Sequence, residues 1–480
     1  MSIIKYGFRF DPLEWIKMGD SVWQAQVRLM LGMDLSGRDR DLLKGRIVEI
    51  LEKKAGDRGE GTAVLLDLLD LGCRPDSPEV RELVEGLLRH HRNETSATES
   101  SDQTDSAHAW KRAGILPDKA VQALCRAGCG YAPEVKSALR WFGNHPETWL
   151  GKPYGCPWEP NSITLSLWEG RGFGPVDDVI QLGFDWFSRE LVEPGLLGHL
   201  DPWGFVEMLG RINHHTAREL AIRLLPIVLR AQKPDGGWGE HSLAVFRMLR
   251  VHGLLNALLD LPPLPPDWRV LRSLPVPKGK VRNLAWDGHT VWVQAVDANE
   301  AVSISPENGA VTRSLPMPAT DIWGIAWYEG QLVACQGGPW KPMKNLLFLD
   351  GSSGELRRKI SLDKVSMAVG LSTYGDRLAI GDGYDFDAKI CDPRHPEELH
   401  SLKWPGTCAG DLTETADGLW HTDSFASLMI KCNPIGKLVD WAELPFNGSI
   451  KGLTWDGAQL WGLDPDENRI CTIERISKDG

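Results

Sequence analysis

The stretch NLAWDG, residues 283–288, decides the fold of the second half of this 480-residue chain. Related stretches recur after it: GIAWYEG from Gly324, GLSTYGD from Gly370, DLTETADG from Asp411 and GLTWDG from Gly452. Successive copies start 41, 46, 41 and 41 residues apart, and each is followed by two further short apolar runs. Four short strands in a unit of about 42 residues are typical of a β-propeller blade. The repeat therefore predicts five blades.

The way in which the ring closes is also indicated by the repeat. VLRSLPVP from Val270 matches VTRSLPMP from Val311, and each lies 13 residues before the first strand of a unit. The last unit shows three apolar runs instead of four. We therefore expect residues 270–275 to supply the outer strand of the last blade, within a propeller that spans 270–480. Closure of this kind removes the large free edge of an open sheet.

The five-fold repeat resembles the five-bladed glutaminyl cyclase family, and less closely other propeller enzymes and sensors. In that family the second strand of a blade carries a Glu beside a Tyr. The aligned positions here are Val293, Ala334, Ile380, His421 and Gly462, none of them acidic. The resemblance therefore implies the fold and argues against cyclotransferase activity.

Polar residues recur where the second strand of each unit ends. They are Asp297 (displaced by one residue), Gln336, Asp382, Asp423 and Asp464. Carboxylates that converge on a channel mouth can hold a hard divalent cation such as Ca²⁺. Because such a residue recurs in every unit, we favour the simpler interpretation that each one caps its own turn. As ligand-binding candidates we take this set together with Trp340.

Departures from the repeat are better functional candidates than its consensus. His421, Asp321 and Trp340 each differ from the residues aligned with them. His421, Asp423 and Asp464 are the weak candidates for catalysis, with Ca²⁺ or Zn²⁺ as the cation that the propeller channel would hold. The recurring tryptophans are instead expected to form the core between blades: Trp286, Trp292, Trp327, Trp420, Trp455 and Trp461.

The first half of the chain has apolar residues at helical spacing. AVLLDLLDLGCRPDSPEVRELVEGLLRHH and AVQALCRAGCGYAPEVKSALRWFGNH both predict helix, Gly-Cys, turn, Pro-Glu-Val and a second helix. Gly72 and Gly128 suit a helix C-cap, and Pro78 and Pro133 suit a first helical position. Looser copies bring the total to about five and a half hairpins. Such hairpins must stack to bury their apolar faces.

The stretch LRAQKPDGGWGEHS, residues 229–242, follows one predicted helix and precedes another. With the hairpins and with CPW at residues 156–158, it resembles the α/α-toroid of terpenoid cyclases and protein prenyltransferases. The resemblance implies a structural motif in which Gln232 caps a helix end and Trp238 stacks against it, beside Gly237. The predicted fold class is thus multidomain: an all-α toroid over 1–261 with a mobile insertion at 92–113, a Pro-rich linker at 262–269, and the all-β propeller.

The helical half lacks the catalytic patterns of the enzymes that it resembles. The nearest runs to the Asp-x-Asp-Asp of the cyclases are Asp67 with Asp70 and Asp177 with Asp178, and neither matches. A zinc set would have to be assembled from Cys156, Asp201, His214, His215 and His241. Adjacent histidines on a helix point to different faces, so such a set is not expected.

Composition limits the function classes further. A net charge of −12 without a long basic run argues against nucleic acid, and no run of 18 apolar residues is present that would span a membrane. Nine scattered Cys fit reduced thiols in a cytoplasm. Our first hypothesis is a non-catalytic protein that binds a small molecule or a protein at its ring mouths. The alternatives are a metal-dependent lyase or cyclase in the propeller channel and a diverged terpenoid enzyme in the helical half.

Overall fold

The computed structural model describes residues 4–54, 61–97, 115–150, 159–174, 176–191, 201–277, 279–337, 344–383, 387–406, 409–423, 428–448 and 450–476. The chain divides into two compact units. The first holds most residues up to Pro263, and the second holds Leu264–Gly480 with two short pieces of the preceding chain.

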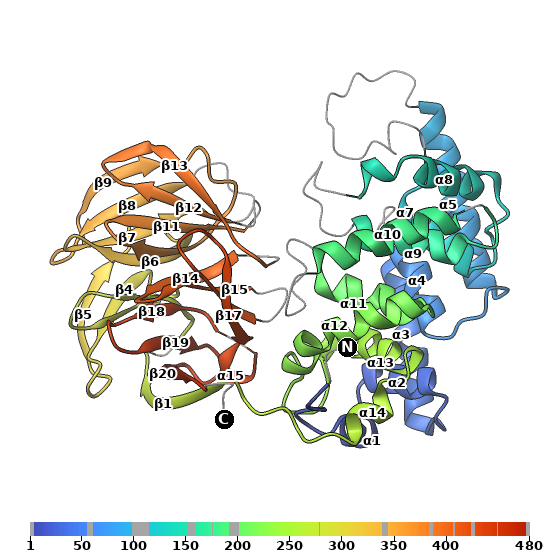
Figure 1. Ribbon diagram of the computed structural model, residues 1–480, viewed down its shortest axis with the longest axis horizontal. Coiled ribbons are helices and arrows are strands. Elements are labelled where there is room, and N and C mark those ends of the chain that lie inside the picture. The colour runs from blue at the N-terminus through green and yellow to red at the C-terminus, as the bar shows by residue number, and fades with distance from the viewer. Residues whose placement is uncertain are drawn as a thin grey trace. The chain divides into compact units, whose positions relative to one another are not determined.

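The first unit is helical (Figure 1). Its α-helices are α1 (Pro12–Met18), α2 (Val22–Leu31), α3 (Gly37–Lys54), α4 (Gly61–Asp70), α5 (Pro78–Ala97), α7 (Asp118–Arg126), α8 (Pro133–Asn144), α9 (Glu159–Gly170), α10 (Asp177–Glu190), α11 (Pro202–Arg211), α12 (His215–Arg230), α13 (Ser242–Val251) and α14 (Leu255–Leu259). Helix α5 extends into the segment 92–113 that was predicted to be an insertion, and residues 98–114 lie outside the described residues. None of the described helices has the length and hydropathy of a membrane-spanning segment.

Four of these helices end in the same way. Helices α2, α4, α7 and α13 are followed by glycines with positive φ: Gly32 (74°), Gly72 (84°), Gly128 (78°) and Gly253 (67°). The next residue donates its N–H back to a carbonyl five residues earlier, as Cys73 does to Leu68 at 2.9 Å. This ending satisfies the last carbonyls of the helix and favours glycine because a Cβ is strained at positive φ. It explains why the two Gly-Cys segments align in sequence.

The helices pack in a regular succession. Helix α4 contacts α7, α7 contacts α9, α9 contacts α11, α11 contacts α13, and α13 also contacts α2. Helices α5, α8 and α10 pack beside α4, α7 and α9 as the second members of hairpins. Four of the expected hairpins, α2–α3, α4–α5, α7–α8 and α9–α10, are therefore present as pairs of packed helices.

The second unit contains five four-stranded antiparallel sheets in its described part, which confirms the five-bladed propeller (Figure 1). Blade one is β2 (Val281–Trp286), β3 (Val291–Ala295), β4 (Glu300–Ile304) and β5 (Val311–Pro316); blade two is β6 (Ile322–Tyr328), β7 (Gln331–Gln336), β8 (Asn345–Asp350) and β9 (Leu356–Ser361). Blade three is β10 (Ala368–Tyr374), β11 (Arg377–Asp382), β12 (Asp387–Asp392) and β13 (His395–Lys403); blade four is β14 (Ala409–Thr415), β15 (Gly418–Asp423), β16 (Leu428–Cys432) and β17 (Leu438–Glu443). Blade five is β18 (Leu453–Trp455), β19 (Leu460–Asp464) and β20 (Arg469–Arg475), completed by β1 (Trp268–Pro275).

Strand β1 closes the ring by pairing antiparallel with β20. The register places Trp268 opposite Arg475 and Pro275 opposite Arg469. The Trp268 indole is buried and donates to the carbonyl of Glu443, at the end of blade four, at 2.7 Å. One strand thus joins the start of the propeller to its last two blades.

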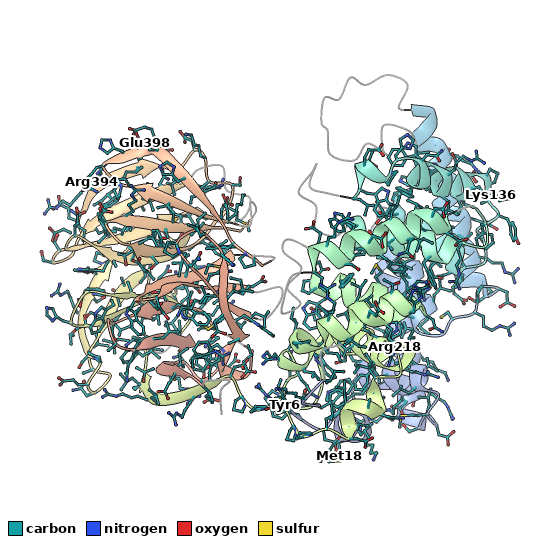
Figure 2. The ribbon with its side chains drawn as sticks, in the orientation of Figure 1. Tyr6, Met18, Lys136, Arg218, Arg394 and Glu398 are labelled. Atoms are coloured by element: carbon teal, nitrogen blue, oxygen red, sulfur yellow. The ribbon has the colours of Figure 1, made fainter. Side chains whose placement is uncertain are left out.

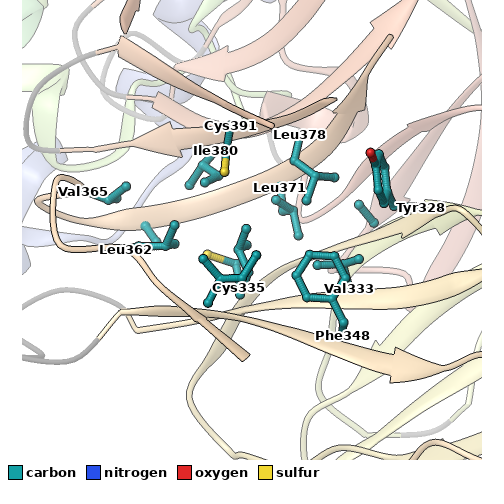
Figure 3. Packing of buried hydrophobic residues seen from close by; sticks show 14 residues of the cluster. Tyr328, Val333, Cys335, Phe348, Leu362, Val365, Leu371, Leu378, Ile380 and Cys391 are labelled. Carbon is teal, nitrogen blue, oxygen red and sulfur yellow. The ribbon is translucent and has the colours of Figure 1, made fainter. Parts of the chain in front are cut away.

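Apolar side chains fill the spaces between blades. Between blades two and three, the buried cluster includes Val333, Cys335, Phe348, Leu371 and Ile380 (Figure 3). Between blades one and two, the indoles of Trp292 and Trp327 stack with centroids 5.5 Å apart. The recurring tryptophans therefore contribute to the packing between blades.

The outer strands carry charge. Arg394 and Glu398 lie at the outer edge of blade three (Figure 2). Arg394 pairs with Asp376 and Asp392, each at 2.9 Å. Charged outer strands discourage pairing with the edge of another sheet.

The innermost strands β2, β6, β10, β14 and β18 pack against one another around the ring. Near the start of each one, the residues at the same repeat position are Asn283, Gly324, Gly370, Asp411 and Gly452. A Cβ on Gly324 would lie 2.6 Å from the amide nitrogen of Leu371, and one on Gly370 would lie 2.4 Å from the carbonyl oxygen of Gly410. Close approach of neighbouring inner strands thus explains the glycine at this position. Blades one and four instead have Asn283 and Asp411 there.

Candidate functional site

Asn283 and Asp411, the two residues that replace glycine, meet at one end of the propeller channel. The Asn283 amide reaches within 3.2 Å of both Asp411 Oδ1 and the carbonyl oxygen of Trp323. Both neighbours are acceptors, so the amide nitrogen is assigned to this side and donates to them. The opposite end of the amide is 2.6 Å from the buried side-chain amide of Gln294.

Both residues lie at a backbone irregularity that recurs in the repeat, since equivalent register shifts fall at Gly324 and Gly370. The pairing register shifts between Arg282 and Leu284 in blade one and between Ala409 and Leu412 in blade four. Asn283 has a φ of 56°, a left-handed conformation that asparagine tolerates better than most residues. Bulges of this kind redirect side chains and are common beside functional sites.

Charged and aromatic residues surround the pair. The repeat position directly before that of Asn283 and Asp411 is occupied by Arg282 in blade one, Trp323 in blade two and Lys451 in blade five. The Arg282 guanidinium lies over the Trp323 ring, 4.8 Å from its centroid. Burial lowers the pKa of Arg282, while the charges of Asp411 and Asp321 oppose that change.

Asp411 has the most informative protonation equilibrium in the propeller. Burial raises the pKa of its carboxyl to about 7, although the positive charges of Lys451 and Arg282 oppose the increase. Both protonation states are therefore populated near neutral pH. A carboxyl of this kind can donate or accept a hydrogen bond, and it can act as a general acid or base.

A cavity of about 420 Å³ is lined by residues of the innermost strands of all five blades. These residues follow the position of Asn283 and Asp411 along each strand, so they lie toward its other end. Hydroxyl groups of Ser372, Thr413 and Thr454 and the indoles of Trp286 and Trp327 contribute to its wall. Glu414 and aliphatic side chains such as Leu284 and Ile325 complete the wall, so the cavity offers both polar and apolar contacts.

The predicted ring of polar residues mainly bonds to nearby backbone. The Asp382 carboxylate accepts from the N–H groups of Ser366 (2.7 Å) and Met367 (3.0 Å). Asp297 accepts from the N–H of Lys280 at 2.8 Å. Asp464 accepts from the N–H groups of two residues in its own turn and from Arg469 Nε, the last at 3.0 Å. Asp464 therefore caps its own turn as predicted, whereas Asp382 and Asp297 bond to the connection that precedes the first strand of their blade.

The rest of that set is placed differently. Gln336 donates to Asp321 (3.1 Å) and accepts from Asn345 (2.9 Å), so it links side chains within blade two. Asp423 is fully buried at the end of β15. Trp340 lies outside the described residues. A ligand-binding role for these residues stays a prediction.

His421, the weak catalytic candidate, is buried and stacks on Trp404 with ring centroids 4.0 Å apart. Burial lowers the pKa of His421 to about 3, so the ring is neutral at physiological pH. Asp423 lies two residues further along the same strand, and Asp464 belongs to blade five. Within the described part of the chain, no three His, Cys, Asp or Glu side chains are grouped so that they would hold a metal ion. The described residues therefore do not fit a Ca²⁺ or Zn²⁺ site.

The helical unit holds a charged cluster made by the C-terminal turns of several helices. Asp70 of α4 accepts from Arg126 of α7 (2.6 Å), Arg211 of α11 (2.7 Å) and Arg247 of α13 (3.3 Å). Glu207 pairs with Arg211 and Arg247 as well. Charges of this kind do not make the apolar surface that an isoprenoid substrate would need.

The other polar candidates of this unit have structural contacts. Asp201 caps α11 by accepting from the N–H groups of Trp203 and Gly204, each at 3.0 Å. His241 stacks on Trp203, and His214 stacks on Phe184. Cys156 lies outside the described residues.

The Gln232 motif fastens the beginning of the chain to the end of α12. Gln232 accepts from the N–H of Phe10 (3.1 Å) and donates to the carbonyl groups of Phe10 (2.9 Å) and Gly236 (2.8 Å). The Trp238 indole donates to Val228 at 2.7 Å. A Cβ on Gly237 would lie 2.6 Å from the Trp15 ring, so this glycine permits the contact. These bonds describe a structural clamp.

Sequence analysis missed Asn283 and Asp411 as a pair, although the signal was present. They open two of the five repeat copies, while glycine opens the other three. A comparison restricted to that single position would have selected both.

Comparisons with known proteins add only general similarity. No protein-family model matches the sequence, and no curated protein matches it at a significant level. Solved structures similar to the propeller part include the glutaminyl cyclase of Myxococcus xanthus, with 12% identity and a TM-score of 0.38 over 44% of this chain and 100% of that chain. A streptogramin B lyase has 10% identity and a TM-score of 0.31 over 44% of this chain and 98% of that chain. The PQQ-bound aldose sugar dehydrogenase of Streptomyces coelicolor has 12% identity and a TM-score of 0.33 over 44% and 99%. At these scores the similarities carry no argument about activity.

Proposed function

We propose that the propeller is a ligand-binding domain that takes a small polar molecule at the Asp411 end of its channel. The observation that carries this proposal is the pKa of Asp411, which burial raises to about 7. An ionised carboxylate there opposes folding, and the equivalent position in three blades holds glycine. A residue that is costly to the fold and has a perturbed pKa is a candidate for function.

The neighbouring charges indicate the chemistry of the ligand. Arg282 and Lys451 provide positive charge for a carboxylate, while Asp411 and Asp321 provide acceptors for an amine. Asn283 fixes the orientation of the Asp411 carboxyl by its hydrogen bond. A small zwitterion such as an amino acid matches this arrangement.

The test is calorimetric titration of the full chain with a panel of free amino acids at pH 7. We expect Asp411→Asn to weaken binding by about tenfold or more, which corresponds to about 1.4 kcal/mol. Glu307→Gln, an exposed change in another part of the propeller, is the matched control and should bind like the parent protein. Equal affinity for all three proteins would refute the proposal.

A second candidate function is an enzyme in which Asp411 transfers a proton. It is favoured by the same carboxyl, because a general acid or base works best with a pKa near the operating pH. Screening for turnover of the amino acids that bind, followed by a pH–rate profile, tests it. A lyase or cyclase of this type predicts a profile with an inflection near pH 7 that Asp411→Asn removes.

We also propose that the helical unit forms a closed α/α ring. Contact of α13 with both α11 and α2 supports closure. The Asp70 cluster supports it too, because the last residues of α4, α7 and α11 meet there, together with Arg247 from the middle of α13, and such convergence is expected of parallel inner helices. A charged centre favours a binding or scaffolding role over terpenoid chemistry.

A further inference from the structure

The junction between blades four and five contains a groove of about 620 Å³. Thr415, Trp420 and Lys431 of blade four form one part of its wall. Trp268 and Trp455 of blade five form another part. Charged side chains also line the groove, and each is already in an ion pair: Asp417 with Lys431, Asp440 with Arg475, and Glu474 with Arg269. This volume is in the range of small-molecule sites.

In blades one and five, the tryptophan equivalent to Trp420 has a hydrogen-bond acceptor within its own blade. In blade one, the Trp292 indole donates to Asp287 Oδ2 at 2.8 Å. In blade five, the Trp461 indole donates to Asp456 Oδ2 at 2.7 Å. The repeat therefore contains its own carboxylate as acceptor for this indole.

Blade four keeps the tryptophan and loses that carboxylate. Trp420 aligns with Trp292 and Trp461, and Thr415 takes the place of Asp287 and Asp456. The Thr415 hydroxyl is within bonding distance of Asp417 and of the carbonyl of Gly418, at 3.0 and 2.9 Å. Trp420 is 6% exposed, no hydrogen bond joins its indole N–H to another described residue, and the nitrogen is not among the sealed, unpaired polar atoms of the core. The Trp420 indole N–H, whose equivalents in blades one and five bond to an Asp side chain, can therefore donate to a ligand in this groove.

A second departure in blade four adds positive charge at the same place. Lys431 lies across from Trp420, where Ser303 lies across from Trp292 and Thr472 lies across from Trp461. Its Nζ is 5.5 Å from the centroid of the Trp420 ring. The side chain is 10% exposed, and its ion-pair partner Asp417 is 72% exposed. Asp417 lines the same groove, so a ligand carboxylate would share the Lys431 ammonium with it or displace it.

We propose that this groove binds a small organic carboxylate. The ligand carboxylate occupies the place that the Asp287 and Asp456 side chains have in their blades. There it accepts the Trp420 indole N–H and pairs with Lys431. The apolar body of the ligand packs against the indoles of Trp268 and Trp455, which line the same groove. Blades one and five carry a carboxylate and a hydroxyl group at the positions of Thr415 and Lys431. Blade four carries a hydroxyl group and an ammonium group there, so it can bind the carboxylate of a ligand.

The probe is benzoate, which joins a carboxylate to a flat apolar ring, and benzyl alcohol is its neutral counterpart. Two-dimensional NMR of the full chain with ¹⁵N-labelled tryptophan reports each indole N–H, and Trp420→Phe identifies the Trp420 signal. We expect benzoate to shift that signal downfield with saturation, and benzyl alcohol to leave it in place. A ligand at the Asp411 end of the channel would leave the Trp420 signal unchanged, so the two proposals are tested separately.

Two substitutions sharpen the test. Lys431→Met keeps the length and removes the charge, and should weaken benzoate binding by about tenfold or more. Lys437→Met removes an exposed lysine of the same blade and should bind like the parent protein.

Thr415→Asp introduces the residue of blades one and five, so we expect it to fold. It should move the Trp420 signal without ligand, raise the melting temperature and abolish the benzoate shift. The proposal is overturned if benzoate leaves the Trp420 signal in place, or if Thr415→Asp binds benzoate as the parent protein does.

Discussion

Replacing Asp70 by Asn tests the charged cluster of the helical unit most directly. The carboxylate binds three guanidinium groups, and the four side chains involved are only 9–19% exposed. Asn preserves the size of the side chain and removes its charge. Arg211 and Arg247 keep Glu207 as an ion-pair partner, whereas Arg126 keeps only a longer-range electrostatic interaction with Glu169 among the described residues.

The expected magnitude follows from that burial. Removing one member of a buried ion pair costs about 3–5 kcal/mol because a charge is left without compensation. Two of the three arginines retain Glu207, so we expect a value near the lower end, about 3 kcal/mol. For a unit of this size, that corresponds to a decrease in melting temperature of roughly 6–12 °C. Differential scanning calorimetry of the full chain measures it on the transition of the helical unit.

The pH dependence gives a second measure of the same contact. Burial alone would raise the pKa of Asp70, but the charges of Arg211, Arg247 and Arg126 outweigh it and hold the pKa well below its usual range. A carboxyl whose pKa is depressed by folding stabilises the protein above its unfolded pKa of about 4. This stabilisation is lost as the pH falls, so the difference between the parent protein and Asp70→Asn should narrow below about pH 4.

Arg126→Met in the Asp70→Asn background supplies the decisive comparison. It removes the charge that the first substitution leaves unpaired, so the double variant should recover at least about half of the lost stability. Asp76→Asn is the control, because Asp76 pairs with Arg74 at an exposed site and should change stability by less than about 0.5 kcal/mol. A loss below about 1 kcal/mol for Asp70→Asn, or a further loss in the double variant, would refute this account.

Other substitutions test the propeller and the helices. The folded state holds the Asp411 proton more tightly than the unfolded state, so the free energy of unfolding of the propeller falls as the pH rises from about 4 to 7. Asp411→Asn should therefore raise that free energy by about 2–4 kcal/mol at pH 8 and leave it nearly unchanged at pH 4. Urea titrations at the two pH values measure the difference. Gly370→Ala places a methyl group 2.4 Å from the carbonyl oxygen of Gly410 and should cost roughly 3 kcal/mol by the same assay; a neutral result would contradict the close packing of the inner strands. Trp268→Ala removes the buried indole of the closing strand and should cost about 3–5 kcal/mol, seen as earlier unfolding of blade five in hydrogen exchange. Gly86→Ala, at an open position within α5, should instead stabilise the helical unit by about 0.5–1 kcal/mol, measured by calorimetry.

Much of the fold could be predicted because it depends on local and repeated signals. Gly72 and Gly128 end helices by their backbone conformation, and the AWDG copies show where each blade begins. Asp11 caps α1 by accepting from the N–H of Leu13, two residues further along the chain. In each case the physical cause lies within a few residues of the signal.

The site could be predicted less well because it depends on contacts between distant residues. Asp70 and Arg247 are paired across 177 positions, and nothing in their local sequence indicates the partner. Asn283 and Asp411 come together because blades one and four face the same channel. The Asp ring was visible as a repeat, but only the bonds of Asp382 to the preceding connection show how its carboxylate is used.

The closing strand has a consequence for synthesis of the protein on the ribosome. Strand β1 is the first propeller strand to be translated, whereas its partner β20 is the last. Trp268 and Arg475 are 207 positions apart, so at about 5–20 residues per second β1 waits roughly 10–40 s for its partner. During that interval the nascent chain carries an unpaired strand with a large indole. Helices α1 to α14 come before it and can fold meanwhile, so the period of greatest vulnerability to aggregation falls late in translation, when the first four blades exist without the strand pair that joins them into a ring.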